Sequence, residues 1–344
     1  MKTVFVGLSG GVDSSVAALK LKESGYRVVG VYMKNWSKDL PGFECPWKED
    51  YLDAKRIAVQ LGIEFELFDF ETEYFDKVVN YMLDEYKIGR TPNPDIMCNQ
   101  EIKFKLFLDA SIDKGADYIA TGHYAGTSNG KLYTAVDQSK DQTYFLYRIK
   151  EQALLKTLFP LANITKSEVR QIASKANLIT ASKKESMGIC FVGKVGIKDF
   201  LKQYINTEPG PIVDQYNQVI GQHDGAIFYT IGQRHGLGLG GGLPMYVTGK
   251  DMAKNTVFVT TKIDNDNLWR QEINITNSHW INTVPDHDTT YYFRTRHRAP
   301  LVKGKFKDQK LISILLEDPI RAITPGQSVV VYSDNLVLGG AIIN

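Results

Sequence analysis

The order of apolar and polar positions predicts that the chain opens as a strand, a tight turn and a helix. Residues 4–6 are apolar, a Ser-Gly-Gly turn follows at 9–11, and Val12, Val16 and Leu19 recur at helical spacing. Glycines allow a tight turn, and the N–H groups that open the following helix favour a phosphate group. An ordinary strand-to-helix turn is the alternative for a Ser-Gly-Gly sequence alone.

The same alternation of strands and helices continues through the first half of the chain. Gly25 ends the first helix, and residues 27–33 form a second apolar run. Helices are expected over 51–61 and 74–86, with strands at 63–70 and 116–122. Strands joined by helices are parallel because the crossover is right-handed. We therefore expect an α/β domain that binds its ligand at the carboxyl ends of parallel strands.

Two shorter patterns follow this alternation. Thr165 and Glu168 have the spacing of a capping box, which predicts that a helix begins there. Residues 131–137 predict a strand or hairpin, and the polar residues 138–142 predict a loop.

Beyond residue 196 the pattern becomes that of β-structure. Short apolar runs are separated by Gly, Pro, Asn and Asp, at 225–231, 245–248, 256–261, 291–296, 311–316 and 328–332. This spacing predicts two small barrel-like modules with a boundary near 264–269. The domain prediction is therefore 1–196 for a catalytic domain, 197–266 for a small central β-rich domain, and 267–344 for a C-terminal β-barrel.

Composition narrows the class of protein. The chain has 344 residues, 43% of them hydrophobic, and a formal net charge of +2. This charge alone favours neither nucleic acid nor membrane, so an RNA-binding surface has to be local. Because no signal peptide or membrane-spanning run is recognisable, we expect a soluble cytoplasmic protein.

One local basic cluster is a candidate for such a surface. Arg294, Arg296 and Arg298 alternate within an expected strand, which would turn all three toward one face. That face is interpreted as a phosphate track, with a solvated β-face as the alternative.

The three cysteines are Cys45, Cys98 and Cys190. Their spacing supports neither a disulfide scaffold nor a cysteine-ligated metal or iron–sulfur cluster, and no metal site is expected. Cys45 is interpreted as a loop cysteine without a catalytic role.

Cys98 ends a proline-containing loop, 89–100, in which two prolines are expected to prevent a regular helix. A helix is expected just after it, at 101–108, whose dipole would favour the thiolate together with Lys103 or Arg90. A buried, inert cysteine is the alternative. Cys190 follows Lys183 and Lys184 closely, and their charge lowers a thiol pKa.

The string SGGVDSS is similar to the pyrophosphate loop of ATP pyrophosphatases, which release AMP and pyrophosphate, and it lacks the Lys of a Walker loop. The resemblance implies that Ser9, Gly10, Gly11 and Ser14 hold phosphates and that Asp13 lies by the Mg²⁺ that accompanies ATP. It also gives the nucleotide a wider set of contacts: Gly7, Leu8, Val12, Met33 and Gly122.

Along nearly its whole length the chain resembles the tRNA-specific 2-thiouridylase family. The strings that carry this resemblance are GLSGGVDSSV at 7–16, GRTPNPDIMCN at 89–99, ATGHYA at 120–125, SKDQTYFL at 139–146, MGICFVG at 187–193, YTIGQRHGLGLGG at 229–241 and TPGQSVVVY at 324–332. The resemblance implies a Rossmann-like parallel sheet of the PP-loop type, a small central β-rich domain and a C-terminal β-barrel that binds tRNA.

The implied reaction converts wobble uridine 34 of tRNAs for Lys, Glu and Gln into 2-thiouridine. ATP adenylates the C2 oxygen, and sulfur arrives as a persulfide on Cys190 from a cysteine desulfurase or a sulfur carrier. Cys98 is the nucleophile that either frees hydrosulfide from the persulfide or resolves a later disulfide. The residues implied to contact tRNA are Asn93, Pro94, Asp95, His123, Lys140, Asp141, Gln142, Arg296, His297 and Gln327.

Taken without the resemblance, His123 is either a structural histidine or a ligand-binding residue at a strand end. Two other classes of protein also fit parts of the sequence. A different ATP-pyrophosphatase synthetase would explain the first loop but leave both cysteines without a role. An RNA-binding protein that holds ATP only as a ligand would release no pyrophosphate.

Overall fold

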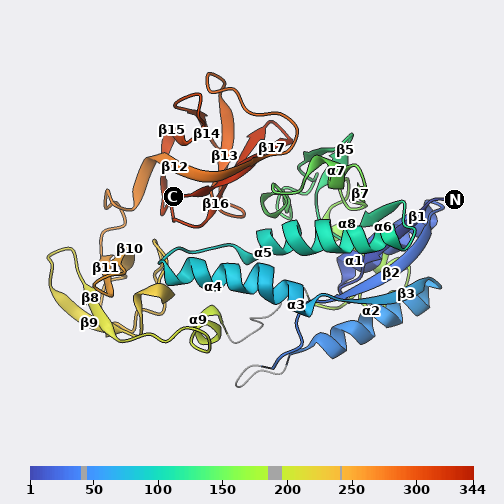
Figure 1. Ribbon diagram of the computed structural model, residues 1–344, viewed down its shortest axis with the longest axis horizontal. Helices are drawn as coiled ribbons and strands as arrows, with labels where there is room; N and C mark the ends of the chain where they lie inside the picture. Colours follow the sequence, from blue (N-terminus) through green and yellow to red (C-terminus); the bar gives the residue numbers. More distant parts are fainter. Residues whose placement is uncertain (40–44, 185–195, 241) are drawn as a thin grey trace.

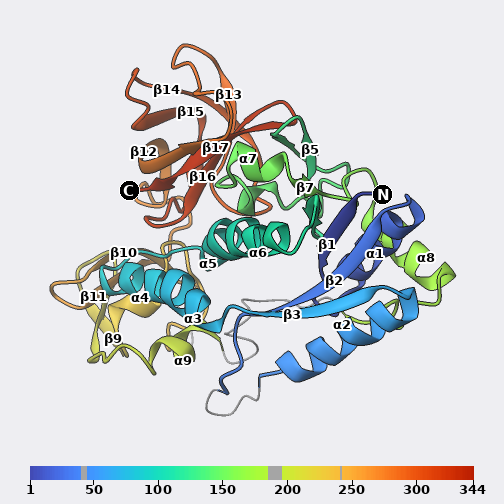
Figure 2. The ribbon, with the colours of Figure 1, turned by 45° about the vertical axis from the view of Figure 1, so that its right-hand side comes forward.

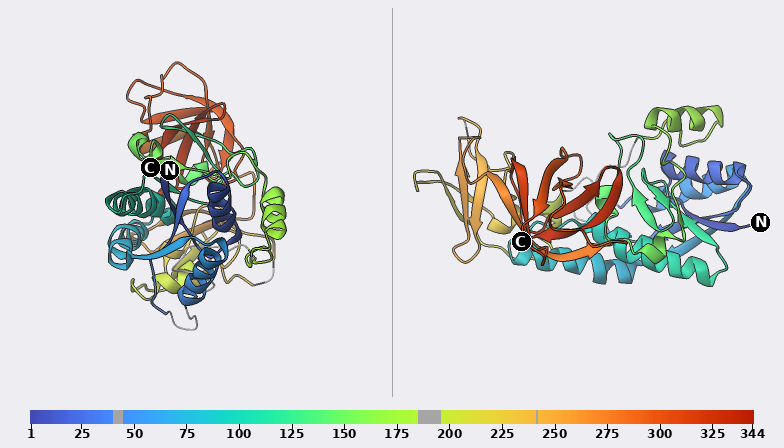
Figure 3. Two further views of the ribbon diagram at one scale, coloured as in Figure 1. Left: turned by 90° about the vertical axis from the view of Figure 1, so that its right-hand side faces the viewer. Right: turned by 90° about the horizontal axis from the view of Figure 1, so that it is seen from above.

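The computed structural model describes residues 1–39, 45–184, 196–240 and 242–344. The N-terminal part is an α/β domain, drawn on the right of Figure 1, with the C-terminal β-barrel above and the central β-rich part on the left. Seen from above, these parts extend along one direction (Figure 3).

The N-terminal sheet is parallel throughout, as the alternating pattern predicts. Its strand order is β3-β2-β1-β4-β7, with β1 at its centre between β2 and β4. The strands are β1 (Thr3–Gly7), β2 (Arg27–Lys34), β3 (Glu64–Asp69), β4 (Tyr118–Ala120) and β7 (Thr157–Leu158). The order reverses at β1, so the loop after β1 lies at the point where such sheets bind ligands.

Helices cover both faces of this sheet (Figure 2). On one face, α1 (Val12–Glu23), α2 (Trp47–Leu61) and α8 (Lys166–Lys175) share an apolar cluster with β1. Thr165 and Glu168 form the predicted capping box at the start of α8. On the other face lie the helical segments α3 (Glu71–Tyr74), η1 (Phe75–Val79), α4 (Asn80–Lys87) and α6 (Phe107–Asp113).

The prediction that the prolines prevent a helix before residue 101 is wrong. Helix α5 (Pro94–Met97) begins at Pro94 and continues through the π-helical η2 (Cys98–Leu106) into α6. Proline is favoured at the first position of a helix, since its missing N–H would have no helical partner there. The Asn93 side chain accepts a hydrogen bond from the Asp95 N–H as the cap. Cys98 therefore lies inside a helix, one turn beyond its start.

The central part contains α9 (Ile197–Leu201) and a sheet with the order β10-β11-β8-β9. Its strands are β8 (Gly210–Val213), β9 (Val219–His223), β10 (Tyr246–Asp251) and β11 (Thr256–Thr260). The strand expected at 225–231 is instead the short 3-10 helix η4 (Ala226–Phe228). Gly225 and Gly232 flank it with positive φ angles, a geometry that ends an extended run.

The C-terminal sheet closes into a barrel because β12 pairs with both β15 and β17. Its strands are β12 (Trp269–Trp280), β13 (Tyr291–Arg294), β14 (Val302–Phe306), β15 (Ser313–Arg321), β16 (Ser328–Ser333) and β17 (Leu336–Ile343). A hairpin from the N-terminal part, β5 (Gly126–Ser128) and β6 (Lys131–Tyr133), pairs with β17 through Leu132 and Tyr133. The first and last parts of the chain therefore share one sheet.

The expected row of arginines on one strand does not exist, because β13 ends at Arg294. Arg294 is buried, with Nη1 3.7 Å from Oδ1 of Asp141. Arg296 donates from Nη2 to the carbonyl oxygens of Ile231 and Ala322, and Arg298 lies in a turn with φ of 62°. Arg294 thus forms a buried ion pair, Arg296 binds backbone carbonyls and Arg298 lies in a turn. The three side chains do not line one face of a strand.

The three parts meet at Thr91. Its N–H donates to the carbonyl of Pro325 (2.9 Å), and its carbonyl accepts from Nε2 of Gln327 (2.8 Å). Its hydroxyl lies 3.2 Å from that of Thr230 in the central part. The segment that leads into α5 is thus bonded to both β-rich parts.

A further contact between the N-terminal part and the barrel joins Phe145 and His297. Phe145 ends the 3-10 helix η3 (Thr143–Phe145), which precedes α7 (Glu151–Leu154). The two ring centroids are 4.6 Å apart. Burial, together with Arg298 and Arg294, lowers the pKa of His297 to about 4.

We expect this histidine to make stability fall in acid. Between pH about 6.5 and 4 the unfolded chain gains a proton at this position that the folded chain does not, so the free energy of unfolding decreases. His297→Phe keeps a ring against Phe145 and removes the titration. Thermal midpoints of both proteins are measured at several pH values, and between pH about 6.5 and 4 that of the natural chain should fall more steeply than that of the variant. Parallel curves would contradict the prediction.

Candidate active site

The loop between β1 and α1 leaves backbone donors available at the start of a helix. Gly11 is the N-cap of α1, and no side chain caps that helix. The Ser14 hydroxyl, inside the loop, donates to the Gly11 carbonyl and accepts from the Ser9 N–H (3.2 Å). Gly10 has a φ of 71°, and a Cβ there would lie 2.7 Å from the Asp50 carbonyl oxygen. The loop is therefore a closely packed cradle, suited to an anionic group.

Neighbouring strand ends complete this cradle. A Cβ on Gly122, just after β4, would lie 2.7 Å from the Ser14 nitrogen, so only glycine fits there. Gly7 ends β1, and a Cβ on it would lie 2.9 Å from Cε of Met33 in β2. The structure thus brings together the loop, Met33 and Gly122 as the sequence predicts. Leu8 and Val12, which flank the glycines, turn their side chains into the core.

Asp13 is the acidic group of the loop, and two side chains from elsewhere hold it. Nζ of Lys166, the first residue of α8, lies 2.7 Å from each carboxylate oxygen. The Tyr124 hydroxyl donates to Oδ1 (2.9 Å). The capping box predicts the start of α8, but neither partner of Asp13 can be predicted, because no local sequence pattern indicates contacts between distant segments.

The segment that leads toward Cys190 is anchored beside the loop. Thr180 donates from its hydroxyl to the hydroxyl of Ser15 (3.1 Å), and Lys183 bonds Asp50 and Asp53 at the start of α2. Desolvation raises the pKa of Asp53, but hydrogen bonds and charge from Lys183 and Arg56 outweigh it and lower that pKa overall. Cys190 and the string at 187–193 lie outside the residues that the structure describes.

Cys98 lies in the helix that follows the Thr91 junction, with 4% of its surface exposed. Asp95 and Asn99, which are near Cys98 in the sequence, have buried polar groups. Burial raises the pKa of Asp95, and Nδ2 of the buried Asn99 donates to the Phe145 carbonyl (3.1 Å). Oδ1 of Asn99 is buried without a hydrogen-bond partner among the described residues. The surroundings of Cys98 therefore include one buried acceptor atom that no side chain in the described part of the chain satisfies.

Cys45 has a different environment. It is buried, and its Sγ lies 3.7 Å from the Trp36 carbonyl oxygen. Burial raises its pKa, which keeps the thiol protonated.

Several residues expected to contact RNA form hydrogen bonds with backbone groups of this chain. Asp141 is buried and accepts hydrogen bonds from Ala135 and Thr143. Gln142 accepts from the Tyr124 N–H through its Oε1, while Gln327 and Arg296 make the contacts described above. Asp141 is buried, whereas Gln142, Arg296 and Gln327 are partly buried.

His123 lies at the strand end next to Gly122. Its Nδ1 is 2.7 Å from the Thr121 hydroxyl, and its ring packs against Phe104 and Phe159. Burial lowers its pKa well below the usual range, so the imidazole is neutral. Lys140 ends a turn that begins at Asp137, whose carbonyl oxygen accepts the Lys140 N–H.

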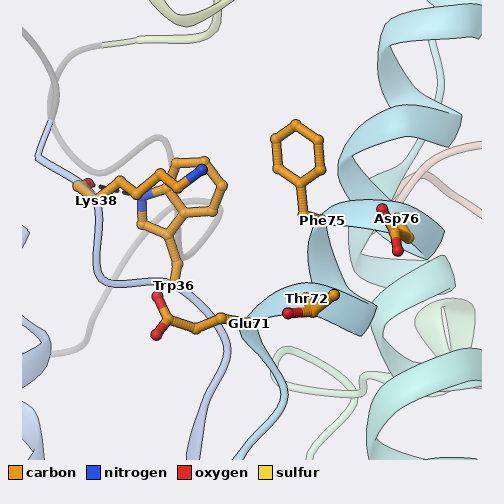
Figure 4. Close-up of a pocket in the computed structure, with 6 residues that line it drawn as sticks. All are labelled: Trp36, Lys38, Glu71, Thr72, Phe75 and Asp76. Carbon is orange, nitrogen blue, oxygen red and sulfur yellow. Dashed lines mark hydrogen bonds between the residues drawn. The ribbon is translucent and has the colours of Figure 1, made fainter.

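Two pockets lie away from the loop. One of about 220 Å³ is lined by Trp36, Lys38, Glu71, Thr72, Phe75 and Asp76 (Figure 4). A wider groove runs between the end of α1 and the β5–β6 hairpin. Neither includes residues of the loop or Cys98. Within the described residues, no helix combines the length and apolar character needed to cross a membrane.

Two solved structures are distantly similar. An NMN synthetase from Francisella tularensis covers 54% of this chain and 66% of its own, with 16% identity and a TM-score of 0.35. A 4-thiouridine synthetase, in a complex with RNA and bound ATP, covers 59% of this chain and 50% of its own, with 18% identity and a TM-score of 0.39. Both TM-scores are too low to bear on function.

Three family models match in succession along the chain. Residues 2–194 match the "tRNA methyl transferase HUP domain", 198–261 the "tRNA methyl transferase PRC-barrel domain" and 270–343 the "Aminomethyltransferase beta-barrel domain".

Curated relatives match over nearly the full length. Proteins named "tRNA-specific 2-thiouridylase MnmA" from Bacillus thuringiensis (strain Al Hakam) and Bacillus cereus (strain Q1) are each 47% identical, covering 99% of this chain and 94% of their own. From this identity and coverage, the chain belongs to the tRNA-specific 2-thiouridylase family.

Proposed function

We propose that the chain is an ATP-dependent tRNA sulfurtransferase that makes 2-thiouridine at wobble position 34 of tRNAs for Lys, Glu and Gln. The observation that carries the proposal is the 47% identity to curated 2-thiouridylases over 99% of the chain. The packed glycine loop and the helix with Cys98 lie within that match. A protein that only binds RNA would need neither.

The loop is the proposed site for ATP. The glycines at 10 and 122 leave room where a Cβ would strike the backbone, and the uncapped α1 offers N–H groups to phosphates. Gly7, Leu8, Ser9, Gly11, Val12 and Ser14 line or support this cradle, and Met33 contacts the adenine. Mg²⁺, held near Asp13, would neutralise phosphate charge when bound.

In the first step the C2 oxygen of uridine attacks the α-phosphorus of ATP. A bond forms between that oxygen and phosphorus, the bond to the β-phosphate breaks, and pyrophosphate leaves. This converts a poor leaving group into AMP. The uracil has to leave its stack to react, and Asn93, Pro94 and Asp95 are its proposed contacts because they open the helix that carries Cys98.

Sulfur then replaces the adenylated oxygen. A cysteine desulfurase or a sulfur carrier loads Cys190 with a persulfide. In one route the Cys98 thiolate attacks the Cys190 sulfur and releases hydrosulfide, which attacks C2 and expels AMP. In the other, the terminal persulfide sulfur attacks C2 and expels AMP, and Cys98 then attacks the Cys190 sulfur to release the product. Both routes end in a Cys98–Cys190 disulfide, which an external thiol reduces.

The tRNA is proposed to lie across the barrel and the N-terminal domain. Lys140, His123 and His297 are its proposed direct contacts. Asp141, Gln142, Arg296 and Gln327 are proposed to act on it by holding the segments that face it, since their polar atoms bond the backbone. The cytoplasm, where tRNA is modified, is the proposed location.

Asp13→Ala should reduce tRNA-dependent AMP formation by at least about a hundredfold, because it removes a group that organises charge at the reacting phosphates. AMP release is measured with ATP, Mg²⁺ and unmodified tRNA for Lys. Asp109→Ala, a change on the exposed side of α6, serves as the control and should leave the rate unchanged. Full turnover by Asp13→Ala would show that the loop is assigned wrongly.

Cys98→Ser and Cys190→Ser should each abolish 2-thiouridine formation while pyrophosphate release continues, because adenylation needs neither thiol. Mass spectrometry of nucleosides from tRNA, incubated with ATP, Mg²⁺ and a persulfide source, measures the product. Cys45→Ala is the control and should retain thiolation. Unimpaired thiolation in either serine variant would refute the role of that cysteine.

A further inference from the structure

The glycine loop between β1 and α1 contains no basic side chain. The string GLSGGVDSSV at 7–16 contains one acidic residue, Asp13, and neither lysine nor arginine. Nucleotide phosphates carry several negative charges, and departure of pyrophosphate requires cations that face it. The proposed Mg²⁺ would supply part of this charge, and a basic side chain from another part of the chain can add to it.

Lys166 brings an ammonium group to this loop. Its Nζ lies 2.7 Å from both Asp13 oxygens, although the two residues lie far apart in the sequence. The Lys166 side chain is 13% exposed and that of Asp13 is 31% exposed. The pair thus lies at the rim of the cradle, partly shielded from water, where a charge-assisted contact is stronger than at an open surface.

The backbone of Lys166 is fixed independently of this contact. Lys166 is the first residue of α8, directly after the capping box of Thr165 and Glu168. Its N–H donates to Oδ2 of Asp137 (2.9 Å). Bonds from Ser139, followed by this one from Lys166, lower the pKa of Asp137, so the acceptor is a carboxylate. The side chain therefore extends from an anchored helix start.

Tyr124 links this pair to the strand end after β4. Its hydroxyl bonds Asp13, and its ring lies 5.8 Å from the Lys166 ammonium. Tyr124 follows Gly122, the glycine that packs on the loop backbone. Three segments therefore converge on one carboxylate: the loop, the strand end and α8.

We propose that Lys166 is a phosphate-binding residue of this site, supplying from α8 the charge that a Walker loop carries in its own sequence. Asp13 and Tyr124 hold its ammonium at the rim, and the ammonium turns to the phosphates when they enter. The assignment rests on the proposed cleavage of ATP at this loop. Lys166 would add one charged contact to the phosphate contacts that the loop itself provides.

Calorimetric titration with inorganic pyrophosphate, without metal and with a chelator present, tests the proposal. Lys166→Met and Lys166→Gln should each weaken pyrophosphate binding by about 10- to 100-fold, the loss expected for a charge-assisted hydrogen bond. Lys175→Met, on an exposed position at the far end of α8, should bind like the natural chain. Asp13→Asn should bind at least as tightly as the natural chain, since it removes negative charge and keeps Lys166.

Thermal midpoints without ligand separate binding from folding. A folded Lys166 variant that binds pyrophosphate as tightly as the natural chain would overturn the proposal, even if that variant is less stable. The natural chain's tRNA-dependent AMP release is measured in parallel. If AMP release persists while the Lys166 variants bind pyrophosphate normally, only the assignment of Lys166 fails. If the natural chain neither binds pyrophosphate nor forms AMP, the proposed function fails with it.

Discussion

The bonds of Thr91 constrain the rest of the molecule. Both its backbone polar groups bind the C-terminal part, and its hydroxyl meets that of Thr230 in the central part. A Cβ on Gly326 would lie 2.8 Å from the Thr91 nitrogen, so the barrel approaches this segment at backbone distance. The helix that carries Cys98 begins only three residues later, at Pro94. These contacts therefore help to fix the position of Cys98 relative to both β-rich parts.

The glycine loop depends on a different kind of constraint, which is lack of space. Ser14, Gly122 and Asp50 approach so closely that side chains at the glycine positions would collide with the backbone. The polar groups that the loop offers to a ligand are the Asp13 carboxylate, the Ser9 hydroxyl and the N–H groups at the start of α1. A rigid cradle with few exposed groups favours one ligand geometry over others. Steric fit and charge are thus supplied by different residues.

The parts of the fold with a strong local signal could be predicted from the sequence. The parallel sheet follows from alternating strands and helices, and the start of α8 follows from its capping box. The loop, Met33 and Gly122 meet because the carboxyl ends of parallel strands share one edge. Each of these inferences needs only nearby residues or a general rule of topology.

Most errors arose where a distant partner decided the outcome, whereas the error at Pro94 was local. Pro94 was expected to break a helix, but its position after the Asn93 cap lets it start one. Arg294 was expected to lie on an exposed strand face with Arg296 and Arg298, whereas it is buried and forms an ion pair with Asp141. Lys166 was missed because its partner lies in a segment far away in the chain. The β5–β6 hairpin has a similar dependence, because its partner β17 follows the whole central part and the other barrel strands in the sequence. During synthesis the edge of β6 stays unpaired until β17 has been made, so the domains named from the sequence cannot finish folding one after another.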